Sequence, residues 1–322
     1  MTDPWYRCEV CRSIVEEDDL FCPNCGTEVA TVKPQRAAGE SGRVLTHQFE
    51  CTGCGASMSY DATSQALRCP FCGSRKLEGR SDRKVLAPRW VIPFQIDETK
   101  ARELLHHWLA RGFWRPNDLA RESTIATIQA VYVPYWSFSG KTHTYWTADT
   151  NRTPPSARAS WFPLSGEHRG QYEGLLIGAS RVLTESETAA LCPFDLTQGV
   201  APSEVDLENV TVELFKVPRK YARHRASELI EEQEAETCRR LYVPGNARNV
   251  HVNVVIEELV GEPILVPIWI LTYRYRNRPF RFLINGQTGS VTGAAPISWI
   301  KVAFAVGLIL VIVLIGMNLL RG

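Results

Sequence analysis

ILVPIWILTYRYRNRPFRF, residues 264–282, is the stretch that decides how the middle of this chain folds. β-Branched and aromatic residues fill it, which is typical of strands. Residues 125–140, IATIQAVYVPYWSFSG, have the same character. Val133-Pro134-Tyr135-Trp136 corresponds to Val266-Pro267-Ile268-Trp269, and each motif follows a predicted helix. We predict a duplicated unit of a helix and an antiparallel sheet. Two unrelated hairpins that both favour aromatic residues are the alternative.

Two helices are predicted beside these strands. Asp97 is a plausible N-cap for the first, and Gly112 ends it. The helical spacing that predicts its buried stripe is carried by Ala101, Leu104, Leu105, Trp108 and Leu109. The second helix spans about residues 219–240, with one side formed by Ala222, Ala226, Leu229, Ile230, Gln233 and Thr237. The acidic residues at 228–236 are expected to be its solvated face, and His106 and His107 to be surface residues.

Turn residues and prolines divide the predicted strands. Ser139-Gly140-Lys141 predicts a turn, and residues 285–289, NGQTG, predict a second one. Residues 250–257 alternate between two faces as one strand. Pro134 and Pro267 cannot donate to a sheet ladder, so we expect them at strand starts, bulges or edges.

Eight of the ten cysteines fall in four C-x-x-C pairs. One set consists of Cys8, Cys11, Cys22 and Cys25, and the other of Cys51, Cys54, Cys69 and Cys72. Two pairs close a tetrahedron around one metal ion, so this spacing predicts two zinc ribbons. The glycines after the second cysteines, Gly26, Gly55 and Gly73, allow the knuckle to turn with positive φ.

Four thiolates leave no open coordination position, so both zinc sites are predicted to be structural. Iron in a rubredoxin-like redox centre is the rival interpretation. Cys192 and Cys238 have no partner by spacing and are expected to be ordinary reduced thiols. Thiolate ligands also favour a reducing compartment, which predicts that the bulk of the chain lies in the cytoplasm.

Charge gives few indications of partners, because the formal net charge is +1. Ribbon one is acidic at residues 16–19, which opposes nucleic-acid binding. The basic stretch after ribbon two contains Arg75, Lys76, Arg80, Arg83, Lys84 and Arg89. It is either a nucleic-acid or lipid contact or a solvated linker. Four arginines, at 274, 276, 278 and 281, alternate with aromatic residues and predict a basic face that is either lipid-facing or simply polar.

Residues 302–320, VAFAVGLILVIVLIGMNLL, carry no charge between Lys301 and Arg321. Such a helix is roughly 28 Å long, close to the hydrocarbon thickness of a bilayer. The N-terminal residues lack the pattern of a signal peptide. We therefore expect a C-terminal membrane anchor with the bulk in the cytoplasm, in agreement with Arg281 and Lys301 preceding the segment.

Sequence motifs for catalysis are absent. Ser139-Gly140-Lys141-Thr142 resembles the end of a P-loop but lacks the first glycine, and no G-x-G-x-x-G, H-E-x-x-H or G-x-S-x-G occurs. The seven histidines are scattered. We expect a protein without enzymatic activity, with an unrecognised hydrolase in the aromatic middle as a weaker alternative.

Several of these stretches together resemble bacterial membrane-anchored zinc-ribbon proteins, often described as containing a transcription-factor-IIB-type zinc ribbon and sometimes mislabelled as replication-restart helicase. The resemblance is carried by CTGCG and CPFCG within residues 51–73, by residues 90–94, 132–136 and 193–196, and by LVPIWILTYRYRNRPFRFLINGQTGSVTGAAPISWIK. It covers nearly everything after residue 50, and the extra front ribbon departs from it. It implies an adaptor, with flotillin-like (SPFH) or phage-shock-protein-A-like partners in envelope-stress modules.

The predicted fold class is α+β: two N-terminal four-cysteine zinc ribbons, a mixed α/β domain with antiparallel sheets, and one C-terminal transmembrane helix. The boundaries are ribbon one at 1–30, a linker at 31–46, ribbon two at 47–80, the domain at 85–296 with repeats at 85–150 and 205–293, and the helix at 301–320. The predicted function is a cytoplasm-facing adaptor at the bacterial inner membrane that binds a protein partner. A membrane-tethered nucleic-acid-binding protein and a redox protein are the alternatives.

Overall fold

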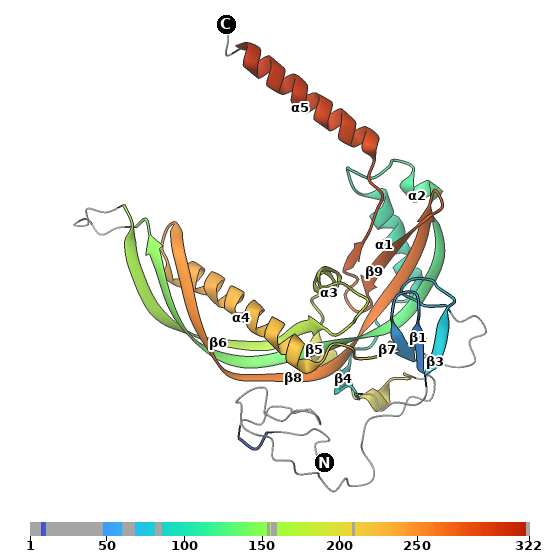
Figure 1. The fold of residues 1–322 in the computed structure, drawn as a ribbon, viewed down its shortest axis with the longest axis horizontal. Coiled ribbons are helices and arrows are strands. Elements are labelled where there is room, and N and C mark those ends of the chain that lie inside the picture. Colours follow the sequence, from blue (N-terminus) through green and yellow to red (C-terminus); the bar gives the residue numbers. More distant parts are fainter. Residues whose placement is uncertain are drawn as a thin grey trace.

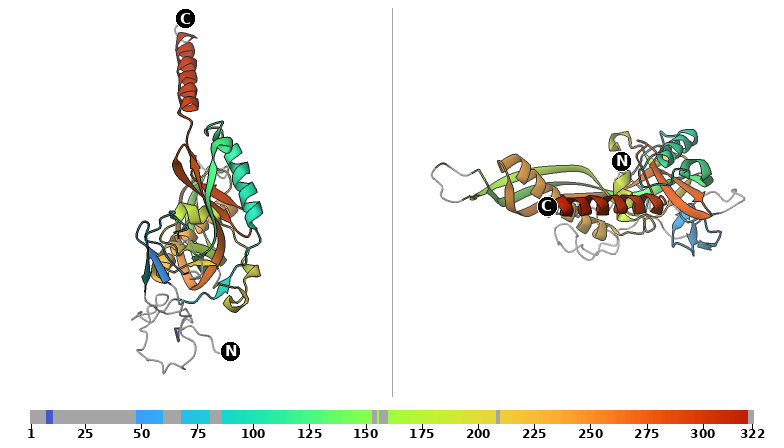
Figure 2. Two further views of the ribbon diagram at one scale, coloured as in Figure 1. Left: turned by 90° about the vertical axis from the view of Figure 1, so that its right-hand side faces the viewer. Right: turned by 90° about the horizontal axis from the view of Figure 1, so that it is seen from above.

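The computed structural model describes residues 8–10, 48–59, 68–80, 86–152, 155, 160–207 and 210–319. Within these residues the chain is a mixed α/β structure built on one ten-stranded sheet, with an apolar helix at its C-terminal end (Figures 1 and 2). The helices are α1 (Glu98–Ala110), α2 (Leu119–Glu122), α3 (Glu185–Leu191), α4 (Arg219–Tyr242) and α5 (Trp299–Leu319). Short 3₁₀ turns lie at Leu196–Gln198 and Pro202–Glu204.

The strands follow the order β10-β9-β8-β5-β7-β2-β1-β3, with β4 added beside β8 and β6 beside β5. Their bounds are β1 (Gln48–Cys51), β2 (Ser57–Ser59), β3 (Leu77–Arg80), β4 (Trp90–Val91), β5 (Thr124–Thr150), β6 (Phe162–Gly178), β7 (Thr211–Glu213), β8 (Ala247–Tyr275), β9 (Arg278–Asn285) and β10 (Val291–Gly293). Most neighbours are antiparallel, while β4 and β7 run parallel to β8 and β5.

Two long antiparallel strands, β5 and β8, form the middle of the sheet. The predicted turn at Ser139-Gly140-Lys141 is wrong, because these residues lie inside β5, a continuous strand of 27 residues. The register shifts there instead, between Phe138 and Gly140 and between Lys141 and Thr142. A Cβ at position 140 would collide with the Glu258 carbonyl oxygen, so glycine permits a close strand approach at this bulge.

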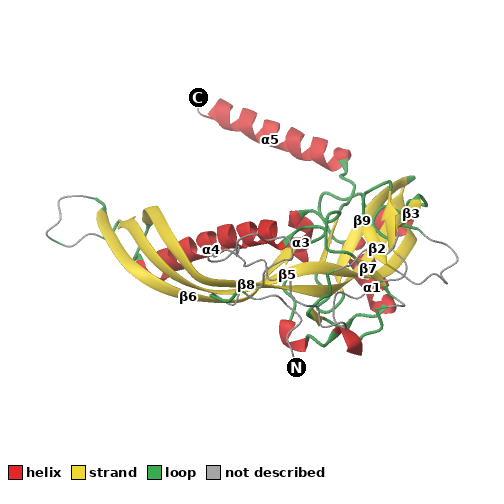
Figure 3. Cartoon of the chain, turned by 60° about the horizontal axis from the view of Figure 1, so that its bottom comes forward, coloured by secondary structure: helices red, strands yellow, loops and turns green. Residues whose placement is uncertain are grey.

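Each long strand continues into a hairpin, and each hairpin is covered by a helix. The β5–β6 hairpin extends as a curved arm together with the first part of β8, and α4 lies along its concave face (Figures 1 and 3). There Ala222 and Ile230 pack against Trp136 and Phe138. Helix α1 covers the β8–β9 hairpin through apolar residues that include Ala101, Leu105 and Leu109.

The two halves make the same contacts around the pairing of Val133 with Val266. Strand β4 pairs with β8 just before Val266, as β7 pairs with β5 just before Val133. The Trp269 indole donates to the Ile96 carbonyl ahead of α1 at 2.7 Å. The Trp136 indole donates to the Val217 carbonyl ahead of α4 at 2.9 Å. Each indole meets a phenylalanine ring edge to face: the centres of Phe94 and Trp269 are 5.4 Å apart, and those of Phe215 and Trp136 are 5.5 Å apart.

The two prolines of the V-P motifs lie in the middle of central strands, so their expected placement at strand starts, bulges or edges is wrong. The Pro134 carbonyl accepts from Ala179, and the Pro267 carbonyl accepts from Gly286. A strand residue directs its N and O to the same side. On that side, β5 pairs with β7 up to Tyr132 and with β6 from Tyr135 onward. Likewise, β8 pairs with β4 up to Leu265 and with β9 from Ile268 onward. The missing N–H therefore falls in a gap between neighbours.

Several local predictions are confirmed. The Asp97 side chain caps α1 by accepting from the Lys100 amide at 2.7 Å, and the expected apolar stripe of this helix is buried or half-buried. Residues 250–257 alternate as predicted, with His251, Asn253 and their alternate neighbours exposed. Residues 285–289 form the predicted turn, which the Asn285 amide closes by donating to the Ser290 carbonyl at 2.8 Å.

The buried side of α4 differs from the prediction. Gln233 is exposed, and the buried residue in that turn is Glu234, which is 0% exposed. Its Oε1 accepts hydrogen bonds from Thr142 at 2.8 Å and from Tyr172 at 2.7 Å. The acidic run at 228–236 is therefore only partly a solvated face, because the helix follows the arm along the row Ala222, Ala226, Ile230, Glu234 and Cys238.

Candidate metal centre and membrane helix

Two knuckles of the same shape bring four cysteines together. In each, the amide of the glycine after the second cysteine donates to the first cysteine's carbonyl at 2.8 Å: Gly55 to Cys51 and Gly73 to Cys69. Both glycines have positive φ, 76° and 72°, which confirms the prediction for these positions. The turns aim the sulfurs of Cys51, Cys54, Cys69 and Cys72 at one point, and all four lie within 4.8 Å of one another.

The donor set fits a tetrahedral metal ion. The Cys51 and Cys72 sulfurs are 3.6 Å apart, and those of Cys54 and Cys69 are 3.5 Å apart. Four sulfurs about 2.3 Å from a zinc ion would be separated by roughly 3.8 Å, so little adjustment is needed. The hydrogen bond between Cys54 and Cys69 lowers the pKa of Cys54 and raises the pKa of Cys69, as expected for two sulfurs that share one proton. These four residues can hold zinc, and four thiolates leave no position for a substrate.

The ribbon around this cluster is part of the main sheet. Strand β2 pairs with β7, with Met58 opposite Glu213 and Ser59 opposite Val212. Cys51, Met58 and Phe71 belong to the same buried core as Val133 and Tyr135. Sequence reasoning missed this docking, since β7 is a three-residue strand with no pattern of its own. A metal at the cluster would therefore stabilise the edge of the large sheet as well as the ribbon.

The remaining cysteines divide into two groups. Of the predicted first set, Cys8 is buried, while Cys11, Cys22 and Cys25 lie outside the described residues. Cys192 and Cys238 are not members of the four-cysteine cluster. Burial raises the pKa of each of these two thiols to about 11, which keeps them protonated and unreactive at neutral pH.

Helix α5 is long and apolar enough to cross a membrane. Its window from Trp299 to Met317 has a mean hydropathy of 2.8, and none of that window is buried against the rest of the chain. It begins slightly before the predicted segment, and it extends away from the sheet (Figure 2). The structure thus supports a candidate membrane anchor at this end.

The arginines of the β8–β9 hairpin do lie opposite its aromatic face. Tyr273, Tyr275 and Phe282 are buried beneath α1. Two of the four arginines pair with carboxylates of the protein. Arg281 forms a two-pronged ion pair with Glu187, at 2.6 and 2.7 Å, and Arg276 lies 3.2 Å from Asp118. Arg274 and Arg278 are exposed and could meet an outside anion.

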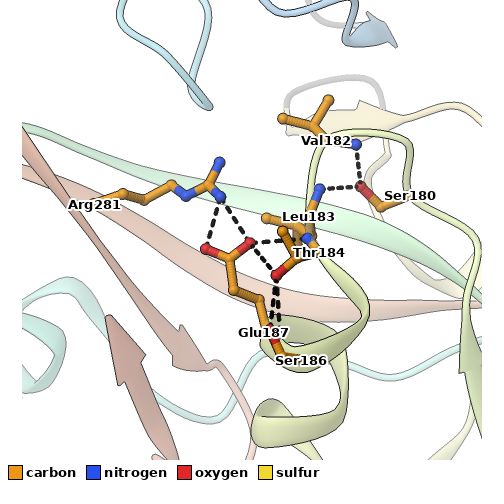
Figure 4. A network of polar contacts seen from close by, with 7 residues as sticks. All are labelled: Ser180, Val182, Leu183, Thr184, Ser186, Glu187 and Arg281. Atoms are coloured by element: carbon orange, nitrogen blue, oxygen red, sulfur yellow. Dashed lines mark hydrogen bonds and ion pairs between the residues drawn. The ribbon is translucent and has the colours of Figure 1, made fainter. Parts of the chain in front are cut away.

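The Arg281–Glu187 pair belongs to a network that the sequence did not reveal (Figure 4). Glu187 and Thr184 form a capping box at the start of α3. The Ser180 hydroxyl accepts from the amides of Val182 and Leu183 and donates to Glu213 at 2.8 Å. Glu213 is 1% exposed, and burial raises its pKa to about 8. The network fixes the segment between β6 and α3 against β7 and β9.

A second polar contact joins two stretches that carry the family resemblance. The side-chain Nδ2 of the buried Asn285 donates to the carbonyls of Leu191 and Pro193 at 2.8 and 3.1 Å. Gln287 and Asp195 exchange two hydrogen bonds, at 2.8 and 3.0 Å. These hydrogen bonds therefore hold residues 193–196 against the turn at 285–289.

The face of the arm opposite α4 carries an open hollow of about 450 Å³. It is lined by Tyr145, Trp146, Thr147, Ser165, Gly166, Glu167, His251, Val252 and Asn253. His143 and Glu167 pair beside it at 2.9 Å. Its lining combines one exposed tyrosine with polar side chains and is open to solvent.

Comparison with known proteins gives one curated relative at meaningful similarity. The chain is 26% identical to the uncharacterised protein YdjG of Bacillus subtilis (strain 168) over an alignment of 319 residues, covering 79% of this chain and 92% of that protein. No protein-family model matches, and no solved structure matches. At this identity the relationship does not by itself place the chain in a family, and the relative's name states no activity.

Proposed function

We propose that the chain is a membrane-anchored zinc-ribbon adaptor that holds a protein partner at the bacterial inner membrane. The observation that carries the proposal is the combination of a four-cysteine cluster, built into one edge of the strand order, with an apolar helix that follows β10 at the opposite edge of that order. A closed metal site supports structure. The exposed arm then offers a long surface for a partner.

Orientation follows from cysteine chemistry and charge. Thiolates that bind metal persist in a reducing compartment, so the sheet and ribbon face the cytoplasm. Lys301 at the start of α5 agrees with that orientation. We propose partners of the flotillin-like (SPFH) or phage-shock-protein-A-like classes, which the resemblance to membrane-anchored zinc-ribbon proteins implies.

We further propose that both four-cysteine sets bind zinc and that neither supports catalysis. Elemental analysis of the purified chain should give about two zinc ions and no iron. Iron in that analysis would instead support the redox alternative. A Cys51→Ser, Cys54→Ser variant should lose one zinc ion, which assigns the second ion to the front ribbon.

The equivalent contacts of the two halves support an internal duplication. The Trp136–Val217 and Trp269–Ile96 hydrogen bonds and the Ala179–Pro134 and Gly286–Pro267 hydrogen bonds occupy matching places. We propose that one helix-and-hairpin unit was copied and that one copy then lengthened into the arm.

Affinity purification of the full chain from gently solubilised native membranes tests the adaptor function. We expect a protein partner in stoichiometric amount. The arm-face variant Tyr145→Ala, His251→Ala should reduce its recovery, whereas the control Tyr221→Ala, on an exposed part of α4, should retain it. Absence of a stoichiometric partner from wild-type membranes would contradict the adaptor proposal.

A nucleic-acid-binding role is favoured by one specific observation: Arg75 and Lys76 are exposed beside the second knuckle. Filter binding of the full chain in lipid nanodiscs across a salt series tests it. Binding through phosphates should weaken steeply as salt rises and should fall in an Arg75→Glu, Lys76→Glu variant. No binding at low salt would remove this role.

A further inference from the structure

The loop between α1 and α2 exposes two neighbouring aromatic side chains. Phe113 is 73% exposed and Trp114 is 48% exposed, and their rings meet edge to face at 5.0 Å. Exposed aromatic pairs are costly in water unless another phase or molecule covers them. Figure 1 places this loop at the end of the molecule from which α5 departs.

The loop is held in a defined conformation. Gly112 has a φ of 129°, and a Cβ there would lie 2.8 Å from the Arg115 side chain. The Arg115 guanidinium lies 3.6 Å from the centre of the Trp108 ring and donates to the Trp108 and Arg111 carbonyls. The aromatic pair is therefore displayed on a fixed turn.

Two hydrogen bonds fasten this turn to the start of α5. The Ser298 amide donates to the Trp114 carbonyl at 2.7 Å, and the Lys301 ammonium donates to the Arg115 carbonyl at 2.8 Å. The Lys301 ammonium also lies 5.9 Å from the centre of the Phe113 ring. The loop thus sits level with the first turn of the helix, where Trp299 and Ile300 are 75% and 84% exposed.

Charge around the loop favours an anionic surface. Arg111 is exposed, and Arg115 and Lys301 lie beside the aromatic pair. The nearest acidic side chain of the loop, Asp118, is paired with Arg276 and accepts from Tyr275 at 2.8 Å. Aromatic side chains and basic residues gather at the interface between lipid headgroups and acyl chains, where both kinds of group are satisfied.

We propose that residues 111–116 form a second membrane contact, in which Phe113 and Trp114 lie at the headgroup level of the bilayer that α5 enters. This inference rests on the proposed function, since it requires α5 to span a membrane. The contact prevents the sheet from swinging freely on its anchor, because the turn is fixed to both α1 and α5. The arm is then held at a constant angle to the bilayer.

Quenching of tryptophan emission by brominated lipid tests the contact. The full chain is reconstituted in phosphatidylcholine–phosphatidylglycerol vesicles with and without bromine on the acyl chains near the headgroup. The emission lost to bromine should fall to about half in Trp114→Phe, because Trp114 and Trp299 are the interfacial tryptophans. Trp90→Phe is the control, since Trp90 is 40% exposed on β4, far from α5, and its removal should leave the lost emission unchanged.

Trp299→Phe separates the inference from the function on which it rests. If Trp299→Phe reduces the quenched emission and Trp114→Phe does not, α5 enters the bilayer but the loop contact is refuted. If neither variant changes the quenching, the membrane anchor itself is refuted. Arg111→Glu adds a charge test, because it should lower Trp114 quenching in vesicles with phosphatidylglycerol but not in phosphatidylcholine alone.

Discussion

The two halves of the sheet share a set of contacts but differ greatly in length. The first half contributes a hairpin whose second strand, β6, has 17 residues, whereas the corresponding β9 has 8. The helices differ in the opposite direction, with 13 residues in α1 and 24 in α4. The short helix precedes the long hairpin, and the long helix precedes the short one. Each helix therefore matches, and packs on, the hairpin of the other half.

The halves also differ in which segment pairs with the outer edge of their short parallel strands, β4 and β7. Strand β4 is bridged by Val200, whose amide and carbonyl exchange hydrogen bonds with Val91 at 3.0 Å. Strand β7 is covered by β2 of the ribbon. Ile92 in the first half corresponds to Glu213 in the second, and both are 1% exposed. Ile92 packs in the same buried core as Cys51 and Met58, whereas Glu213 faces the ribbon from a strand that pairs with it directly.

Removing the metal should produce the largest difference in stability between the two halves. Metal binding supplies on the order of 10–16 kcal/mol in isolated zinc fingers, and the ribbon shares its core with β7. In hydrogen-exchange measurements on Cys54→Ser, Cys69→Ser, we expect the β2 and β7 amides to lose protection while β4 amides keep theirs. Cys192→Ser is the matched control and should retain both metal and protection. Unchanged β7 protection would show that the ribbon docks without metal.

Glu213 should give the second half a pH dependence that Ile92 cannot give the first. Its folded pKa of about 8 lies above the usual value of 4.5, because burial penalises the charged form. The folded state thus keeps a proton that the unfolded chain releases. This contribution to stability is complete below pH 4.5 and is lost as pH rises toward 8. Relative to the wild type, Glu213→Gln should gain about 1 kcal/mol per pH unit between pH 5.5 and 7.5.

Glu187→Gln is the control for this measurement. Burial acts to raise the pKa of Glu187, but the Thr184 amide and Arg281 outweigh it and lower the pKa. The stability from Glu187 is therefore lost only as pH falls below the ordinary range of a carboxyl group, so its difference from the wild type should be flat over the same window. Chemical unfolding of both variants in detergent gives the comparison. A flat profile for Glu213→Gln would contradict a buried, protonated Glu213.

The equivalence of the two halves can be measured at their tryptophans. Trp136→Phe and Trp269→Phe each remove one hydrogen bond to a carbonyl ahead of a helix. Each should cost about 1–2 kcal/mol, since a half-buried carbonyl loses its donor. Trp146→Phe is the control, because the buried Trp146 indole has no hydrogen-bond partner among the described residues. Costs for Trp136 and Trp269 that differ by several-fold would argue against equivalent roles.

Local features of both halves were predictable from the sequence. The Asp97 cap, the glycine turns of the second ribbon and the turn at residues 285–289 depend on a few adjacent residues, so their patterns are sufficient. The alternation along residues 250–257 could be recognised in the sequence because the arm has one face under α4 and one face open to solvent. The four-cysteine cluster followed from ligand spacing alone.

Features that depend on distant partners were not predictable. Gly140 resembles a turn residue, but it serves the close approach of Glu258 more than one hundred residues away. Pro134 is tolerated in a central strand because the pairing of β5 with β7 stops at Tyr132 and its pairing with β6 starts only at Tyr135. Glu234 is buried because Thr142 and Tyr172 from two strands reach it. The pairing of the ribbon with β7 likewise has no local signal.

The smallest expected difference concerns how the two helices begin. Asp97 caps α1 with its side chain, while the corresponding Pro218 leaves α4 without a side-chain cap. Asp97→Ala should cost about 1 kcal/mol. Pro218→Asp adds an acceptor, but it also frees the unfolded chain, which offsets about 0.4–1 kcal/mol of the gain. Its net effect should therefore be close to zero.

Pro218→Ala separates these two contributions. The difference in unfolding free energy between Pro218→Asp and Pro218→Ala isolates the cap, because both variants lack the proline. If the helix starts are equivalent, this difference should equal the loss in Asp97→Ala, about 1 kcal/mol. A much smaller difference would mean that the first-turn amides of α4 already have partners, so that the longer half begins its helix by another route than the shorter half.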